Sequence, residues 1–182
     1  VPRVVPRVVP RMVPRMLGEK AGGLLKTWCE SKGVVVHTGT TVESIEAGDE
    51  ELKVVLASGD VCPADVVIVS TGVKPNVSFL DDTGLNIDQG IVVDEFMQTS
   101  VSDIYAAGDC AQGLDFSTGE TAVHAVQPTA TEHGRFAAHN MATGNALPYK
   151  GSLNMNILDT LGLVTSSFGA WEGVEGGDSA EL

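Results

Sequence analysis

The sequence has no long apolar run and nothing that looks like a targeting segment. No stretch reaches the roughly 18 consecutive apolar residues that a membrane-spanning helix requires. Its first residues lack the apolar central region of a secretory signal peptide. We therefore expect a cytoplasmic protein that does not interact with a membrane.

Cysteines are few and are not arranged in pairs. Cys29, Cys62 and Cys110 are odd in number and far apart, with no Cys-x-x-Cys or metal-type spacing. This pattern excludes a disulfide framework and predicts no metal site. Each cysteine is expected to be a reduced, partly buried thiol. Cys110 has no second thiol nearby, so packing is favoured over a redox role.

Basic residues are scarce as well. There are 11 Lys and Arg against 24 Asp and Glu, which gives a net charge of −13, and four of the arginines lie within residues 1–15. Such a surface repels nucleic acid and anionic lipid and would favour basic partners or none. Aromatic residues make up only 5% of the chain, while glycines number 21. A core of Val, Ile, Leu and Ala with many turns favours an α/β fold with a parallel sheet.

The first half of the chain predicts an extended arm, a helix and a β-meander. Residues 1–16 repeat a Val-Pro-Arg tetrapeptide, whose regular prolines exclude a helix or a central strand and predict a polyproline-like arm. Residues 18–32 have apolar side chains at helical spacing, and Gly33 ends the helix. A short buried strand is expected at 34–37, followed by β-rich runs separated by glycine-bearing turns. The apolar face of the helix is Leu17, Ala21, Leu24, Leu25, Trp28 and Cys29.

Two short apolar runs predict buried strands that end at glycines. Residues 64–69 lead into Gly72, and residues 104–107 lead directly into Gly108 and Asp109. Ligands of open α/β sheets bind beyond the carboxyl ends of the strands, so these residues are candidates for ligand contact. Taken alone, however, a strand followed by an Asp-capped turn is common in α/β proteins.

A second helix is predicted to begin near Gln127. Pro128 suits its first turn, and Gly144 suits its end. We expect its buried face to be small residues at helical spacing, and its histidines to be surface or capping groups rather than catalytic ones. The small-residue face is Ala130, Gly134, Ala137, Ala138 and Met141, and the histidines of this region are His124, His133 and His139.

Three segments together resemble the FAD-dependent pyridine nucleotide-disulfide oxidoreductases, including the rubredoxin reductases, nitrite reductases and NADH oxidases. The segments are residues 70–76 (Ser-Thr-Gly-Val-Lys-Pro-Asn), residues 90–100 and the run from Thr99 to Asp109. The resemblance is strong over 64–144, weaker over 17–63 and 148–169, and starts only at Pro14 within the repeat. It implies FAD and NAD(P)H as cofactors, a small molecule or a redox protein as electron acceptor, and a homodimer.

The resemblance also implies roles for individual residues. Asp109 would hydrogen-bond to the ribityl and pyrophosphate part of FAD after the turn at Gly108, and Gly72 would border the nicotinamide. The backbone of Thr129 and Ala130, at the positive end of the helix dipole, would face the pyrimidine end of the flavin. No catalytic side chain is implied.

The expected domain organisation follows from the same resemblance. We expect an α/β protein with partial Rossmann-like FAD- and NAD(P)-binding domains, a β-meander and the start of an α+β interface domain. The ranges are 1–16 for the repeat arm, 17–75 for half of the NAD(P) domain, 76–147 for half of the FAD domain and 148–182 for the interface domain.

No Gly-x-Gly-x-x-Gly motif follows any expected strand, although both nucleotides would require one. The chain therefore resembles the carboxyl-terminal part of an oxidoreductase that transfers hydride from NAD(P)H to FAD. The alternative is a non-catalytic fragment or interaction module with incomplete cofactor sites. A flavin-free dehydrogenase is disfavoured by the missing motif.

Overall fold

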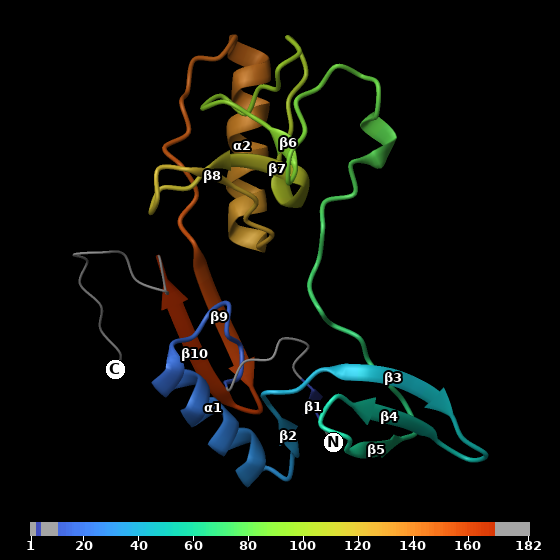
Figure 1. Ribbon diagram of the computed structural model, residues 1–182. Helices are drawn as coiled ribbons and strands as arrows, with labels where there is room; N and C mark the ends of the chain where they lie inside the picture. Colours follow the sequence, from blue (N-terminus) through green and yellow to red (C-terminus); the bar gives the residue numbers. More distant parts are fainter. Residues whose placement is uncertain (1–2, 5–10, 170–182) are drawn as a thin grey trace. The chain divides into compact units, whose positions relative to one another are not determined.

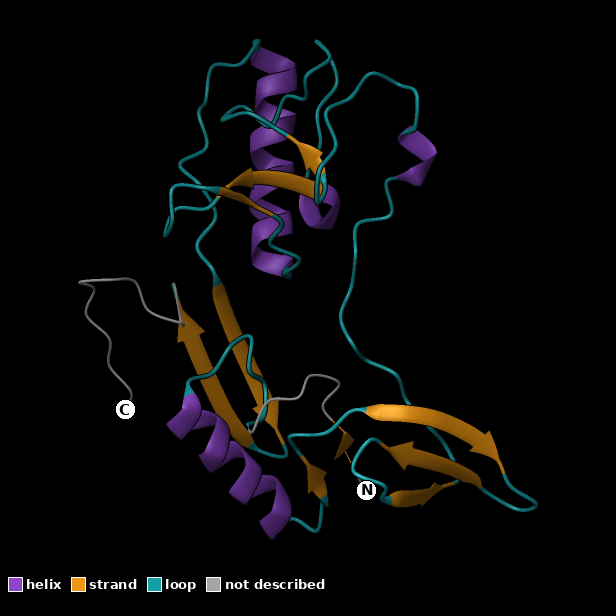
Figure 2. Ribbon diagram, in the orientation of Figure 1, coloured by secondary structure: helices purple, strands orange, loops and turns teal. Residues whose placement is uncertain are grey.

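The computed structural model describes residues 3–4 and 11–169, arranged in two compact units (Figure 1). Among the described residues, the first unit comprises 3–4, 11–72 and 157–167, and the second comprises 73–156 and 168–169. The rest of the Pro-Arg repeat and the acidic tail from residue 170 onward lie outside the described residues. The division of secondary structure into helices and small sheets confirms the α/β class (Figure 2).

The first unit contains the predicted helix, α1 (Glu19–Ser31). Leu25 is fully buried and packs in one cluster with Leu17 and Cys29, as the helical spacing predicts. Gly33 follows the helix with φ +84°, a conformation that favours glycine, so the predicted end is confirmed. The predicted face is wrong at Leu24, which is 60% exposed.

The Pro-Arg repeat is not a free extended arm. β1 (Arg3–Val4) pairs in parallel with β2 (Val36–His37), and Met12 is fully buried against α1 and β2. The expected polyproline-like arm is therefore wrong at residues 3–4, whereas β1 is an edge strand and not a central one. Proline blocks a strand only at its own position, whereas the Arg-Val steps between prolines keep their N–H donors.

The β-meander is confirmed. β3 (Val42–Ala47), β4 (Leu52–Leu56) and β5 (Val61–Ala64) form an antiparallel sheet in the order β3-β4-β5. Its inner side buries a small cluster of Val54, Leu56 and Cys62. The connecting turns contain Gly48 and Gly59, where the sequence placed them.

The strand expected over residues 64–69 is wrong beyond Ala64, where β5 ends. Residues 66–71 belong to no helix or strand, and three apolar side chains of this stretch are largely exposed: Val66 at 73%, Ile68 at 87% and Val69 at 70%. A β-rich run becomes a strand only when a neighbouring strand satisfies its backbone. No strand of the described residues pairs with it.

The second unit is built around α2 (Gln127–Thr143) and a small sheet of β6 (Ile91–Val92), β7 (Ala111–Leu114) and β8 (Thr121–Ala122). β6 and β7 are parallel, whereas β7 and β8 are antiparallel. Figure 1 shows this sheet beside the helix, and a shared apolar core joins them. Two short 3-10 turns, η1 (Ser78–Leu80) and η2 (Gly108–Cys110), complete the unit.

The predicted strand over residues 104–107 is reduced to an isolated bridge between Tyr105 and Gln98. Ala106 is buried, but Ile104 is 43% exposed. The run nevertheless leads directly into η2, so Gly108 and Asp109 lie on a turn rather than within a regular element.

The start and end of α2 are confirmed, but its predicted face is not. Pro128 lies in the first turn and Gly144 caps the end with φ +73°. The buried positions are Thr129, His133, Ala137 and Asn140, while Gly134, Ala138 and Met141 are exposed. Asn140 makes three side-chain hydrogen bonds on this inner face, and Nε2 of His133 has Ser152 as its partner, whereas Nδ1 of His133 has none among the described residues.

The last described elements are β9 (Met155–Thr160) and β10 (Leu163–Phe168), which pair with each other. Exposure alternates along much of both strands, as it does in strands buried on one face. Trp28 of α1 donates a hydrogen bond from its indole N–H to the carbonyl oxygen of Thr160, at 3.0 Å. No helix among the described residues has the length and apolar character needed to cross a bilayer.

Candidate functional site

The turn at Gly108 lies against the first turn of α2. Gly108 has φ +77°, and a Cβ placed on it would lie 3.5 Å from the Cβ of Ala130. This left-handed conformation lets the chain pass close to the helix, which only glycine does without strain. Asp109, the next residue, is exposed and lies beside the amino end of α2. Three of the residues implied by the resemblance, Gly108, Asp109 and Ala130, are thus brought together.

The amino end of α2 is open to an electron-rich group. Its N-cap residue, Val126, is extended and provides no side-chain hydrogen bond to the helix. The N–H groups of a first helical turn have no partner within the helix, and the dipole there is positive. Thr129 is only 4% exposed as a whole residue, so its backbone and its side chain both present little surface, whereas Ala130 is half-buried.

Gly72 lies in the first unit, with φ +113°. A Cβ placed on it would lie 3.8 Å from a guanidinium nitrogen of Arg15. Sequence analysis missed Arg15, because it was hidden within the Pro-Arg repeat. A cation beside an exposed glycine backbone is an arrangement that suits an anionic group such as a phosphate.

A buried polar network lies beneath α2. Nε2 of His133 is 3.1 Å from Oγ of Ser152, and both residues are 1% exposed. The hydroxyl oxygen of Tyr149 lies 3.2 Å from both Oε2 of Glu132 and Oγ of Ser152, and it can donate its single proton to one of them at a time. Burial, followed by the proximity of His124, lowers the pKa of His133 against an opposing effect of Glu132. His133 therefore favours its neutral form.

The expectation that the histidines are surface or capping groups is wrong for two of them. His133 is fully buried, and His124 is 8% exposed with its Nε2 3.1 Å from Oδ2 of Asp115. Burial also raises the pKa of Tyr149, so its hydroxyl stays protonated and able to donate. These groups hold the second unit together, and none of them contacts Asp109 through a hydrogen bond in the described part of the chain. His139 is exposed, as expected.

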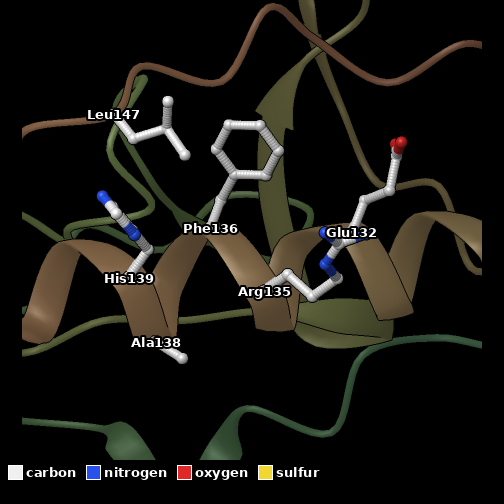
Figure 3. Close-up of a pocket in the computed structure, with 6 residues that line it drawn as sticks. All are labelled: Glu132, Arg135, Phe136, Ala138, His139 and Leu147. Atoms are coloured by element: carbon white, nitrogen blue, oxygen red, sulfur yellow. The ribbon is translucent and has the colours of Figure 1, made fainter.

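A pocket of about 450 Å³ lies elsewhere on α2 (Figure 3). Phe136 and Leu147 project to the same side of the helix, with His139 beside Leu147. Arg135 and Glu132 line its other end. None of the five implied cofactor-contacting residues lines this pocket, so the hollow does not correspond to the site at the amino end of α2. Within the described ranges, no three His, Cys, Asp or Glu side chains are grouped to hold a metal ion.

Comparison with known proteins identifies the family. The family described as pyridine nucleotide-disulphide oxidoreductase matches residues 4–129, which include β2, the meander, η2 and the start of α2. The chain belongs to this family. Its members are NAD(P)H-dependent flavoprotein oxidoreductases that use FAD and NAD(P)H. The match begins at residue 4, well before Pro14, so the expected start of the resemblance is wrong.

Individual relatives agree with this assignment. The NADH-dependent phenylglyoxylate dehydrogenase subunit epsilon of Aromatoleum evansii is 33% identical over 159 residues, covering 87% of this chain and 38% of the relative. The NADH oxidase of Methanocaldococcus jannaschii is 35% identical over 120 residues, covering 65% and 27%.

The solved structure of an NAD-dependent persulfide reductase from A. fulgidus matches with a TM-score of 0.79 and 35% identity, covering 86% of this chain and 29% of that one. The chain thus spans less than two fifths of the length of these relatives. They nevertheless confirm the Rossmann-like fold family.

Proposed function

We propose that the whole protein transfers hydride from NAD(P)H to FAD and passes the electrons to an acceptor, and that this chain provides part of both cofactor sites. The observation that carries the proposal is the turn of Gly108 and Asp109 against the first turn of α2. This arrangement places three features together: a carboxylate that accepts hydrogen bonds, a glycine turn without a side chain, and the free N–H groups of the first helical turn.

The described residues fit a flavin at this turn. FAD, when bound, supplies the chemistry of accepting a hydride and releasing its electrons. The carboxylate of Asp109 would accept hydrogen bonds from the hydroxyls of the ribityl chain. The backbone N–H groups around Thr129 and Ala130 would face the pyrimidine edge of the ring. The positive end of the α2 dipole would stabilise negative charge there by roughly 0.3–1 kcal/mol.

Gly72 and Arg15 support a contact to the nicotinamide nucleotide. The positive φ of Gly72 leaves its backbone uncovered by a side chain, so a flat ring could approach it closely. The guanidinium of Arg15 would lie within reach of the nucleotide's phosphates. The choice between NADH and NADPH and the identity of the acceptor, a small molecule or a redox protein, are outside this proposal. A homodimer and a cytoplasmic location are part of it, on the basis of the resemblance and the acidic composition.

The exposed apolar stretch at residues 66–69 supports the proposal that this chain forms only part of each cofactor site and that additional sequence forms the rest. Val66, Ile68 and Val69 have the composition of a strand buried on both faces, yet they are largely exposed. In addition, the relatives are much longer than this chain. We propose that the stretch becomes a central strand of the NAD(P) domain when the rest of that domain is present. The predicted boundaries at residues 75 and 147 are part of the same proposal.

The second candidate function is a non-catalytic interaction module, which the same exposed stretch favours. An unpaired apolar segment can add to the sheet of another chain. Flavin content distinguishes the two functions, because an interaction module would bind its partner without FAD.

The test is a hybrid in which the amino-terminal part of the persulfide reductase relative precedes residues 11–182 of this chain. We expect a yellow protein that NADH bleaches. Asp109→Asn should weaken FAD binding about tenfold to a hundredfold, because a hydrogen bond to a charged group contributes about 1.5–3 kcal/mol. Asp103→Asn, at another exposed aspartate of the same loop, is the control. A colourless hybrid, or equal FAD affinity in the two variants, would refute the proposal.

A further inference from the structure

Cys62 and His37 form a thiol–imidazole contact in the first unit. Sγ of Cys62 lies 3.7 Å from Nε2 of His37, within hydrogen-bonding distance for sulfur. The two residues come from different sheets, since His37 is in β2 and Cys62 is in β5. The contact is separate from the turn at Asp109, which belongs to the second unit.

The strand that carries Cys62 is favourably placed for reaction. β5 is the outer strand of the meander, so one of its edges is unpaired within this sheet. Cys62 points inward with 8% exposure, while its neighbours Val61 and Pro63 point outward. Outer strands open locally at lower free energy than central strands. His37 is itself partly exposed.

We propose that Cys62 is a nucleophilic thiol, activated by His37, that is reversibly modified by low-molecular-weight disulfides. In this step the imidazole of His37 takes the thiol proton, and the thiolate attacks one sulfur of the disulfide. The bond from Sγ to that sulfur forms while the sulfur–sulfur bond of the reagent breaks. The leaving thiolate takes up the proton from the imidazolium. One disulfide is consumed and one mixed disulfide is formed, so no further oxidant is needed.

The other two cysteines lack this arrangement and serve as internal comparisons. Cys29 is 3% exposed and, like Cys62, belongs to an apolar cluster, but among the described residues no hydrogen bond joins its thiol to a base. Cys110 is more exposed than Cys62. Its thiol donates a hydrogen bond to the carbonyl oxygen of Ala107 at 3.5 Å, but a carbonyl oxygen is not a base that can deprotonate the thiol. If exposure alone decided reactivity, Cys110 would react first. If the neighbouring base decides, Cys62 would react first.

The test uses glutathione disulfide with the 182-residue chain at neutral pH, and peptide mass mapping to follow each cysteine with time. We expect Cys62 to be modified faster than Cys110 in the native protein. His37→Gln, which keeps a polar side chain but cannot take the proton, should slow Cys62 about tenfold or more, because the thiol loses its neighbouring general base. The rate at Cys110 should not change. Added thiol should restore free Cys62.

The same reaction is measured with the unsubstituted protein and the His37→Gln variant unfolded in urea, as a control for effects that do not depend on the folded structure. In the unfolded chains Cys62 should react at equal rates with and without His37, because the contact no longer exists. Faster reaction at Cys110 than at Cys62 in the native protein would overturn the proposal. So would an unchanged Cys62 rate in a folded His37→Gln variant. If that variant does not fold, the order of reaction of the two cysteines in the unsubstituted protein decides alone.

Discussion

Removing the side chain of Asn140 should destabilise the second unit strongly. Asn140 is fully buried on α2. Its amide nitrogen donates to the carbonyl oxygens of Phe96, at 3.0 Å, and Leu147, at 2.9 Å, while its side-chain oxygen accepts from the N–H of Leu147 at 2.9 Å. Each hydrogen bond contributes about 1 kcal/mol, and their partners are left unsatisfied. We therefore expect Asn140→Ala to cost about 3 kcal/mol or more.

Hydrogen exchange of the α2 peptides is the assay, because it reports the stability of this unit separately from the first. A loss of about 3 kcal/mol corresponds to a decrease in protection of more than a hundredfold. Asn76→Ala is the matched control, since Asn76 is exposed in the same unit and should change stability by less than about 0.5 kcal/mol. A decrease of less than tenfold in Asn140→Ala would refute the reasoning from its three hydrogen bonds.

Two further predictions concern stability. Burial lowers the pKa of His133 below its ordinary 6.5, so the unfolded chain takes up this proton first as pH falls. The free energy of unfolding of the second unit should be greatest above pH 6.5 and should decrease as pH falls through the lowered pKa of His133. Urea titrations should show a smaller decrease in the His133→Asn variant. An equal decrease in the variant would contradict His133 as the origin of the pH dependence. Gly23→Ala should stabilise α1 by about 1 kcal/mol, because its new Cβ meets no atom within 4 Å. Gly22→Ala should destabilise the protein by about 1–3 kcal/mol, because its Cβ would lie 2.8 Å from the carbonyl oxygen of Met12. Thermal unfolding followed by circular dichroism should therefore show a higher Tm for Gly23→Ala and a lower Tm for Gly22→Ala. Shifts of the same sign in the two variants would be inconsistent with the space around the two glycines.

Sequence patterns predicted those helices and strands whose formation depends mainly on residues close together along the chain. α1, the meander and α2 follow from helical spacing, glycine-bearing turns and end signals at Gly33, Pro128 and Gly144, which act within a few residues. The juxtaposition of Gly108 and Ala130 came from the resemblance rather than from any spacing. The roles of Gly72, Gly108, Asp109, Thr129 and Ala130 stay predictions.

What sequence patterns missed depends on contacts between distant residues. The inner face of α2 carries His133 and Asn140 because Ser152, Phe96 and Leu147 supply their partners, and apolar periodicity cannot detect this. Residues 64–69 have the composition of a strand, but a strand also requires a neighbour. Met12 is buried because α1 covers it, although its repeat has no sequence pattern of a compact element.

The stretch from Val66 to Val69, of which Val67 packs against an apolar cluster while the other three side chains are exposed, has a consequence for handling this polypeptide. It is short, uncharged, β-branched and free of proline, the same properties that allow identical segments to stack into fibrils. Self-association of this stretch increases with protein concentration, whereas binding to a specific partner saturates once the partner is fully bound. We therefore expect a purified sample of this polypeptide to associate as its concentration rises.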